Sequence, residues 1–291
     1  MIVVTTPTGS TGSQVVQHLL DLGAPVRVVV RDPGRLPAQV RERVDVVPGS
    51  HGDAEVVEKA FAGADAVFWV APPNYRAPSL EAVYSDFARP ACEAFAQQGV
   101  GRVVGLSALG RGSALAGRAG LVTASLAMDD LIAGTGVAYR SLAAPGFMDN
   151  ALRQVGSIRD RGVFTSPLSP DRALPTCATR DIAAVAATLL LDGSWDGQDS
   201  VPLLGPEDLS GNDMAAIIAE VLGRPVRYEQ VTGEEYLAGL VGHGMSEVVA
   251  RGMLDMFVAK DNGLDEARLD ASRSLTPTTF RRWCEDVLAA A

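Results

Sequence analysis

The sequence predicts an α/β protein built on a doubly wound parallel sheet. Short runs rich in β-branched residues alternate with amphipathic helical patterns through the first half of the chain. Such runs are typical of parallel strands that are buried on both faces. Each helical pattern ends near a glycine, which suits the C-terminus of a helix. Together these observations indicate helices packed on both faces of one sheet.

The first half of the chain supplies most of the expected elements. Strands are expected at residues 2–4, 26–30, 44–47, 66–70, 103–106 and 137–142. The helices between them are expected at residues 12–22, 54–61, 80–98 and 124–134. Residues 1–150 are therefore predicted to form the core of the sheet.

The second half of the chain differs in pattern. A helix is expected at residues 180–191, a short strand at 201–204, an amphipathic helix at 209–222 and a strand at 226–230. A helical segment at 233–259 is interrupted by glycines at 242–244, and a last helix is expected at 276–289, with Pro277 in its first turn. Residues 151–291 are predicted to complete the sheet around 201–204 and to form a small, mostly helical lobe.

Composition and charge exclude several classes of partner. The formal net charge of −10 would repel nucleic acid and anionic membranes. Cys92, Cys177 and Cys284 lie far apart without a CxxC or Cys/His cluster, so we expect reduced thiols and no metal site. The first apolar run has no basic n-region, and no uncharged apolar stretch is long enough to span a bilayer. We therefore expect a cytoplasmic protein.

A glycine-rich turn, TTPTGSTG at residues 5–12, joins the first expected strand to the first expected helix. Gly9 and Gly12 allow the backbone to approach a ligand, and the helix N-terminus directs free N–H groups and a partial positive charge into the turn. The turn departs from the usual dinucleotide pattern because Thr6 stands where a glycine is expected, so a plain strand-to-helix turn is the alternative. The candidate pyrophosphate-binding residues are Thr6, Thr8, Gly9, Ser10, Thr11 and Gly12.

The second expected strand ends in the stretch VRVVVRDPGRL. Roughly 20 residues after the glycine turn, an acidic residue would accept from the ribose 2′-hydroxyl of NAD. Arg31 occupies this position, and Arg35 follows about one turn later. Two guanidinium groups suit a 2′-phosphate, so NADP(H) is favoured, while Asp32 keeps NAD(H) open.

Seven stretches, spread over nearly the whole chain, together resemble a known family. They are VVTTPTGSTGSQVV, VRVVVRDPGRL, ADAVFWVAPP, VVGLSALG, GVAYRSLAAPGFMDN, TRDIAAVAATLL and GPEDLSGNDMAAIIAEVLGRPVRY. In this order they resemble the NmrA-like group of atypical short-chain dehydrogenase/reductases, which includes NADPH-dependent quinone and dye reductases. The sequence departs from that group at Thr6 and Pro7, where Gly-Ala is usual, and has Ala where an Arg commonly precedes Pro145.

The resemblance implies a Rossmann-type NAD(P)-binding core over residues 1–150 and a lobe on the substrate side. It implies that residues 71–73 line the adenosine and ribose path, and that Ser107 and the turn at 145–147 lie near the nicotinamide. For Ser107, a hydroxyl that caps the next loop is an equal alternative. The further cofactor candidates are His51, Ala71, Pro72, Pro73, Ser107, Met128, Pro145 and Phe147, and the substrate candidates are Asn74, Tyr75, Phe147, Met148, Asn150 and His243.

The chain lacks the Tyr-x-x-x-Lys pair with which typical short-chain dehydrogenases protonate a carbonyl. Four residues after its five tyrosines stand Ser79, Ala88, Ala143, Thr232 and Leu240. Ser107 is then the one catalytic candidate. An acceptor that needs hydride but little acid help fits this chain. A quinone is one, because hydride addition gives a phenolate whose conjugate acid has a pKa of about 10.

Two functions follow from these observations. The first is an NAD(P)H-dependent reductase of a quinone or aromatic polyketide-type acceptor, with no flavin or metal. In a narrower form, it would be the reductase component of a monooxygenase system with a partner oxygenase. The second is a non-catalytic NADP(H)-sensing regulator that acts through a protein partner.

Overall fold

Seven parallel strands form the central sheet of the computed structural model, which describes residues 1–268 and 273–291. Their order is β10-β6-β5-β4-β1-β2-β3. The strands are β1 (Ile2–Val4), β2 (Val26–Val30), β3 (Asp45–Pro48), β4 (Ala66–Trp69), β5 (Arg102–Ala108), β6 (Ala138–Ala144) and β10 (Gln198–Pro202). The order reverses between β1 and β4, and in such sheets a ligand binds beyond the carboxyl ends of the strands at this point. The predicted doubly wound fold is confirmed.

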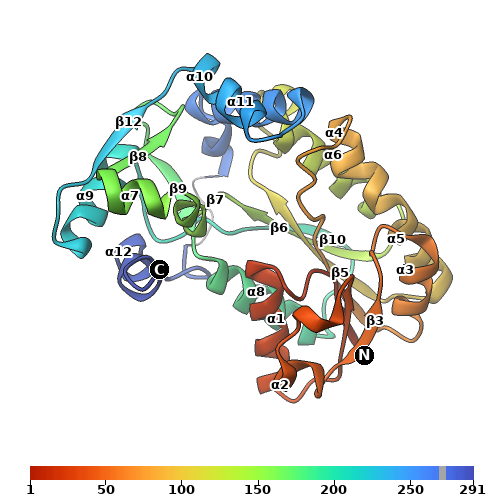
Figure 1. Cartoon of the computed structure of the whole chain (residues 1–291). Coiled ribbons are helices and arrows are strands. Elements are labelled where there is room, and N and C mark those ends of the chain that lie inside the picture. The colour runs from red at the N-terminus through yellow and green to blue at the C-terminus, as the bar shows by residue number, and fades with distance from the viewer. Residues whose placement is uncertain (269–272) are drawn as a thin grey trace.

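Helices cover both faces of the sheet (Figure 1). One face carries α1 (Ser10–Asp21) and α8 (Thr179–Leu191), and the other carries α3 (Ala54–Phe61), α5 (Ser85–Gln98) and α6 (Leu121–Ala133). Successive strand residues point to opposite faces, so Val4 packs toward α1 and α8 while Val3 packs toward α3 and α5. This explains why the strands are apolar throughout. No helix in the described ranges is both long and apolar enough to cross a membrane.

The chain after β6 forms a lobe and also returns to the sheet, as the helix α8 on one face and as the edge strand β10, the strand expected around residues 201–204. Two small sheets, β11-β9-β7 and β12-β8, support the lobe. Its apolar core includes Ile158, Phe164, Ile218, Phe280 and Trp283. The lobe comprises β7 (Gly146–Phe147), η3 (Met148–Gln154), α7 (Val155–Arg161), β8 (Val163–Ser166), β9 (Leu174–Cys177), β11 (Asp208–Leu209), α9 (Gly211–Leu222), β12 (Arg227–Gln230), α10 (Gly233–Gly242), α11 (Glu247–Asp261) and α12 (Phe280–Trp283).

The loop between α10 and α11 contacts the segment that follows β4. The backbone N–H of Ser246 donates to the carbonyl of Tyr75 at 2.8 Å, and the Ser246 hydroxyl donates to the carbonyl of Ala77 at 2.7 Å. In Figure 1, α10 and α11 reach from the lobe toward α4 (Leu80–Val83) and α6. The lobe therefore holds the loop that carries two of the substrate candidates.

Two helices differ from the expected ones. The helix expected at 80–98 is broken into α4 and α5 at Tyr84, whose φ of −119° and ψ of −76° interrupt the helix while its ring packs among apolar neighbours. The last helix begins at Phe280 instead of Thr276, so the expectation that Pro277 lies in its first turn is wrong. The residues before it are extended because Thr278 donates from its backbone and its hydroxyl to the carboxylate of Asp181, both at 2.8 Å.

Candidate cofactor site

The turn between β1 and α1 keeps the shape of a glycine turn although Thr6 is not glycine. Thr6 has a φ of 99° and is the single non-glycine residue with positive φ in the described ranges. A side chain in this conformation costs about 1–3 kcal/mol. A Cβ on Gly12 would lie 2.1 Å from the carbonyl oxygen of Thr6, so α1 packs directly on the loop backbone. This contact leaves Gly12 no room for a side chain.

The N-terminus of α1 presents N–H groups that the described chain does not use. Gly9 is the N-cap and provides no side-chain hydrogen bond. The first intrahelical-type bond runs from the N–H of Ser13 to the carbonyl of Gly9, at 3.0 Å. The N–H groups of Ser10, Thr11 and Gly12 precede it and have no backbone acceptor among the described residues. Such a terminus fits a pyrophosphate, because its N–H groups and its dipole both favour an anion.

The hydroxyl groups predicted for this turn differ in exposure. Thr8 and Ser10 are exposed, Thr6 is half-buried and Thr11 is buried. The hydroxyl of Thr5, which was not a candidate, has a structural role. It donates to the carbonyl of Phe68 at 3.0 Å and accepts from the N–H of Val70 at 3.1 Å, so it joins β1 to the end of β4.

Two unpaired cations lie at the end of β2, the neighbour of β1. Arg31 and Arg35 are exposed, and neither side chain forms a hydrogen bond or ion pair with a described residue. Asp32 instead caps the short helix η1 (Pro33–Arg35), since its carboxylate accepts from the N–H of Gly34 at 2.9 Å. The arginines are available to a 2′-phosphate, whereas the carboxylate of Asp32 is already engaged.

His51 lies beside the end of β4 as a buried ring. Its Nε2 is 2.9 Å from the carbonyl oxygen of Val70, to which it donates, and its edge meets the rings of Trp69 and Phe87 with centroids 5.2 and 4.9 Å away. Burial lowers the pKa of His51 to about 4, so the ring is neutral at pH 7. His51 therefore supports the backbone that leads into residues 71–73.

The segment after β4 is largely accessible. Ala71, Pro72 and Tyr75 are half-buried, and Pro73 and Asn74 are exposed. The side chain of Asn74 accepts from the N–H of Arg76 at 3.2 Å, as in an Asx turn. These residues line the edge of the sheet beside the turn that carries Gly9 and Gly12.

The turn after β6 is tied to the glycine turn by side chains that the sequence did not suggest. Asp149 accepts from the N–H and the hydroxyl of Thr179 at 3.1 and 2.9 Å. The amide of Gln14 on α1 donates to the same hydroxyl at 2.9 Å. Phe147 is half-buried beside Asp149, and Asn150 is exposed. The turn after β6 and the first turns of α1 are thus connected through Thr179, the first residue of α8.

Two methionines and one proline of the candidate set are buried. Met128 and Met148 each have an exposure of 0%. Met128 packs under the sheet and Met148 packs in the core of the lobe, so neither side chain is accessible at the surface of the described structure. Pro145 is also buried, which leaves Phe147 as the apolar side chain of this turn that a ligand can reach.

Ser107 on β5 faces a buried acid on α6. Its hydroxyl donates to Oδ2 of Asp129 at 2.6 Å and lies 3.2 Å from the hydroxyl of Ser125. Tyr139 and Ser141 on β6 donate to the same carboxyl at 2.6 and 2.8 Å. Burial raises the pKa of Asp129, although the hydrogen bonds from Ser107, Tyr139 and Ser141 oppose this shift. Asp129 was not a candidate, but it directly follows Met128.

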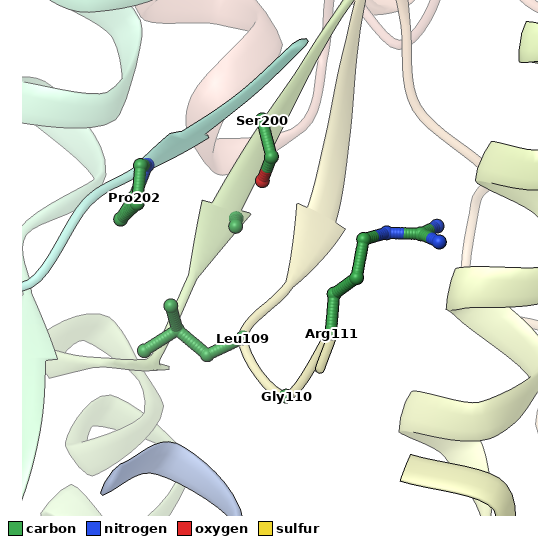
Figure 2. Close-up of a pocket in the computed structure, with 6 residues that line it drawn as sticks. Leu109, Gly110, Arg111, Ser200 and Pro202 are labelled. Atoms are coloured by element: carbon green, nitrogen blue, oxygen red, sulfur yellow. The ribbon is translucent and has the colours of Figure 1, made fainter. Parts of the chain in front are cut away.

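A small pocket lies beyond the carboxyl end of β5 (Figure 2). It encloses about 10 Å³, which suits roughly one water molecule and no aromatic ring. The guanidinium of Arg111 points away from it and reaches α6, where it lies 2.8 Å from Oδ1 of Asp130 and donates to the carbonyl of Leu126 at 3.2 Å. The pocket is lined by Leu109, Gly110, Arg111, Ala143, Ser200 and Pro202.

A groove of about 720 Å³ lies between α4, α10 and α11. It is lined by Leu80, Glu234, Leu237, Ala238, Val241, Glu247, Val248, Arg251, Gly252 and Asp255. None of these belongs to the candidate set. His243 lies just outside, at the end of α10, where its exposed ring is 2.6 Å from the carbonyl of Gly239 on its own helix.

Two family models match this chain. The model described as NAD(P)H-binding covers residues 7–192, and the model described as the NmrA-like family covers residues 134–285. The chain belongs to the NmrA-like family. The NAD(P)H-binding match begins at residue 7, within the β1–α1 turn, and extends past the end of α8, so it includes the N-terminus of α1 and the elements that follow it up to α8.

Several relatives of this NmrA-like protein are named as reductases. It is 28% identical to the NAD(P)H azoreductase of Xenophilus azovorans over 285 residues, 98% of this chain and 96% of that protein. It is 32% identical to the (4-alkanoyl-5-oxo-2,5-dihydrofuran-3-yl)methyl phosphate reductase of Streptomyces griseus over 231 residues, 79% of this chain and 77% of that protein. The solved NADPH-dependent quinone oxidoreductase of Escherichia coli in complex with NADPH shares the fold, with a TM-score of 0.81, 21% identity and 99% of each chain covered.

The conformation of Thr6 predicts an asymmetric response to substitution. Thr6→Gly should be more stable than Thr6→Ala by about 1 kcal/mol or more, because only glycine removes the penalty of a Cβ at positive φ. Urea unfolding followed by circular dichroism measures the difference. Gly23→Ala is the matched control, since Gly23 has a φ of 72° and open space around its Cα, so it should lose a similar amount. Equal stability of the two Thr6 variants would show that the turn is unstrained.

Proposed function

We propose that this NmrA-like protein is an NADPH-dependent reductase that transfers hydride to a conjugated acceptor, preferably a quinone. The observation that carries the proposal is the uncapped N-terminus of α1 behind a closely packed glycine turn, at the point where the order of the sheet reverses. Membership of a family whose model is described as NAD(P)H-binding supports the same assignment. NADPH, when bound, supplies the hydride.

Different residues of the candidate cofactor site would hold different parts of the dinucleotide. The N–H groups of Ser10, Thr11 and Gly12 would hold the pyrophosphate, with Thr6 and Thr8 beside them. Arg31 and Arg35 would hold the 2′-phosphate of NADP(H). NAD(H) would leave both arginines without a partner.

The class of acceptor follows from the names of the relatives and from the residues of this chain. An azo compound, a quinone and an unsaturated lactone each carry a conjugated double bond that accepts hydride and leaves a stabilised anion. This chain has no Tyr-x-x-x-Lys pair, and Tyr139 is fully engaged with a buried carboxyl. An acceptor whose reduced form is a weak base suits such a site. Phe147, Asn74 and Tyr75 are the accessible side chains that would contact it.

More narrowly, we propose that the acceptor is an aromatic polyketide quinone. A dihydroquinone reacts with oxygen far more readily than its quinone, so the product would serve a separate partner oxygenase. Comparing product formation with and without oxygen, in the presence of such a partner, would separate this form from simple quinone reduction.

The first functional prediction concerns the choice of cofactor. Arg31→Ala should weaken NADPH binding by about 1.5–3 kcal/mol, because one charge-assisted contact to the 2′-phosphate is lost, and should leave NADH binding nearly unchanged. Calorimetric titration with both cofactors measures this. Arg89→Ala on α5 is a control of equal charge, since Arg89 is exposed and its ion pair is with Asp86 on its own helix. Equal weakening of both cofactors by Arg31→Ala would contradict a 2′-phosphate site.

The second functional prediction concerns the reaction. With NADPH deuterated at C4 of the nicotinamide, oxidation of the cofactor by quinone or azo acceptors should be slowed by a primary isotope effect, an enone product should carry deuterium on carbon, and simple ketones should not react. The loss of NADPH absorbance measures the isotope effect, and mass spectrometry of the enone product measures the transfer to carbon. NADPH binding without transfer to any acceptor would instead favour a cofactor-sensing regulator.

A further inference from the structure

The carboxyl of Asp129 is enclosed, but no cation neutralises it at close range. Its side chain is 2% exposed. The nearest cation is the guanidinium of Arg111, 3.8 Å from Oδ2, and that group is closer to Asp130, at 2.8 Å. A purely structural buried carboxylate is usually paired at hydrogen-bond distance. Here hydroxyl groups surround it instead, and a hydroxyl can either donate a proton or accept one.

The hydroxyl groups run from the interior toward the carboxyl edge of the sheet. In the register of β5 and β6, Tyr139 pairs with Val103, Ser141 with Gly105, and Ser107 with Ala143. Ser107 therefore lies two residues, or about 6.6 Å, closer to the edge than the level of Ser141. Among Tyr139, Ser141 and Ser107, Ser107 therefore lies nearest to the carboxyl edge of the sheet, and it is 7% exposed.

Gly105 makes this arrangement possible. A Cβ at this position would lie 2.3 Å from the hydroxyl oxygen of Tyr139, so a side chain would displace the Tyr139 ring. Without one, the ring lies across β5 and its hydroxyl reaches Asp129 at 2.6 Å. The interior end of the group is thereby closed to water, since Tyr139 is only 2% exposed.

We propose that Asp129 stores a proton and that Ser107 passes it to the anion formed when the acceptor takes up hydride, an inference that rests on the proposed reductase function. Ser107 is the group that meets the reduced acceptor, and Asp129 acts through it as a positioning residue. The path is the hydrogen bond of 2.6 Å between the two side chains.

The proton balance of this step is complete within the chain. The O–H bond of Ser107 breaks as its proton goes to the oxygen or nitrogen anion of the acceptor. Oγ of Ser107 then takes the proton of Asp129, which becomes a carboxylate. Tyr139 and Ser141 stabilise that carboxylate by donating to it. After the product leaves, water at the edge of the sheet returns a proton to Asp129 through Ser107.

Few charges act on Asp129. The titratable and charged groups that face it are Tyr139 from β6 and Arg111 from the segment after β5. The other described elements in contact with α6, namely α4, α5, α11 and the short helix η2 (Ala116–Arg118), provide no charge that shifts its pKa. Burial raises this pKa, so the acid form persists to higher pH than for an ordinary carboxyl. Turnover should fall as the pH rises through it.

The test is the pH dependence of kcat for a series of quinones whose reduced forms differ in pKa, with NADPH oxidation by the wild-type protein as the reference. Ser107→Ala and Asp129→Asn should lower kcat about tenfold to a hundredfold while the NADPH Kd stays the same. The loss should grow as the reduced acceptor becomes more basic, and Asp129→Asn should abolish the alkaline decrease. If the two residues had only a structural role, the variants would lower kcat by the same factor for every acceptor.

Two further variants keep the test independent of folding defects. Tyr139→Phe should move the alkaline decrease to higher pH, because it removes a hydrogen bond that lowers the pKa of Asp129. Asp160→Asn, at an exposed carboxylate of α7 in the lobe, should leave the profile unchanged. If the wild type oxidises NADPH with these quinones and folded Ser107→Ala and Asp129→Asn match it at every pH, the relay is overturned while the reductase function stands. If the wild type oxidises NADPH with none of them, both fall.

Discussion

The hydroxyl of Thr5 holds β1 and β4 together at the place where the order of the sheet reverses. It bonds the backbone of β4 on both sides of Trp69, through the carbonyl of Phe68 and the N–H of Val70. His51 donates to the carbonyl of the same residue, Val70. The glycine turn leaves β1 and residues 71–73 leave β4 from this junction. Every group assigned to the cofactor is positioned relative to it.

This fixed junction explains how Thr6 can occupy a conformation that normally requires glycine. A conformation that costs about 1–3 kcal/mol persists when its surroundings allow no alternative. Here β1 ends two residues before Thr6, and α1 packs on the Thr6 carbonyl through Gly12. The loop therefore has little freedom to relax. The glycine pattern of the sequence is incomplete, but the backbone that the pattern encodes is present.

The sequence predicted the parts of the fold and site that depend on local pattern. The strands, the glycine turn and the arginines after β2 are all visible as short motifs. The link from Asp149 through Thr179 to Gln14 is not, because Gln14 and Thr179 are 165 residues apart in the chain and the three residues follow no period. The same holds for Asp129, whose partners come from β5 and β6. The sequence pointed to Met128, yet adjacent helical residues point about 100° apart, so only one of the two can face Ser107.

The short strands of the lobe could not be predicted from the sequence, for a related reason. Its strands β7, β8, β9 and β11 are two to four residues long, too short for an alternating pattern to be detected. They form because they pair with segments far away in the chain, as β8 does with β12. The contacts of Thr278 with Asp181 similarly extend the chain before α12, where Pro277 alone suggested a helix start.

The candidate site has exposed positive charge at one end and a buried carboxyl at the other. The chain carries a formal charge of −10, so an anionic cofactor is repelled overall and must be attracted locally. In the proposed function, Arg31, Arg35 and the N-terminus of α1 would supply that attraction at an exposed edge, where salt screens it. Asp129 lies behind Ser107 with 2% of its side chain exposed, so salt hardly reaches it, and burial raises the pKa of its carboxyl. Exposure at one end and enclosure at the other would let a single acidic chain bind an anion and keep an acid near the same edge of its sheet.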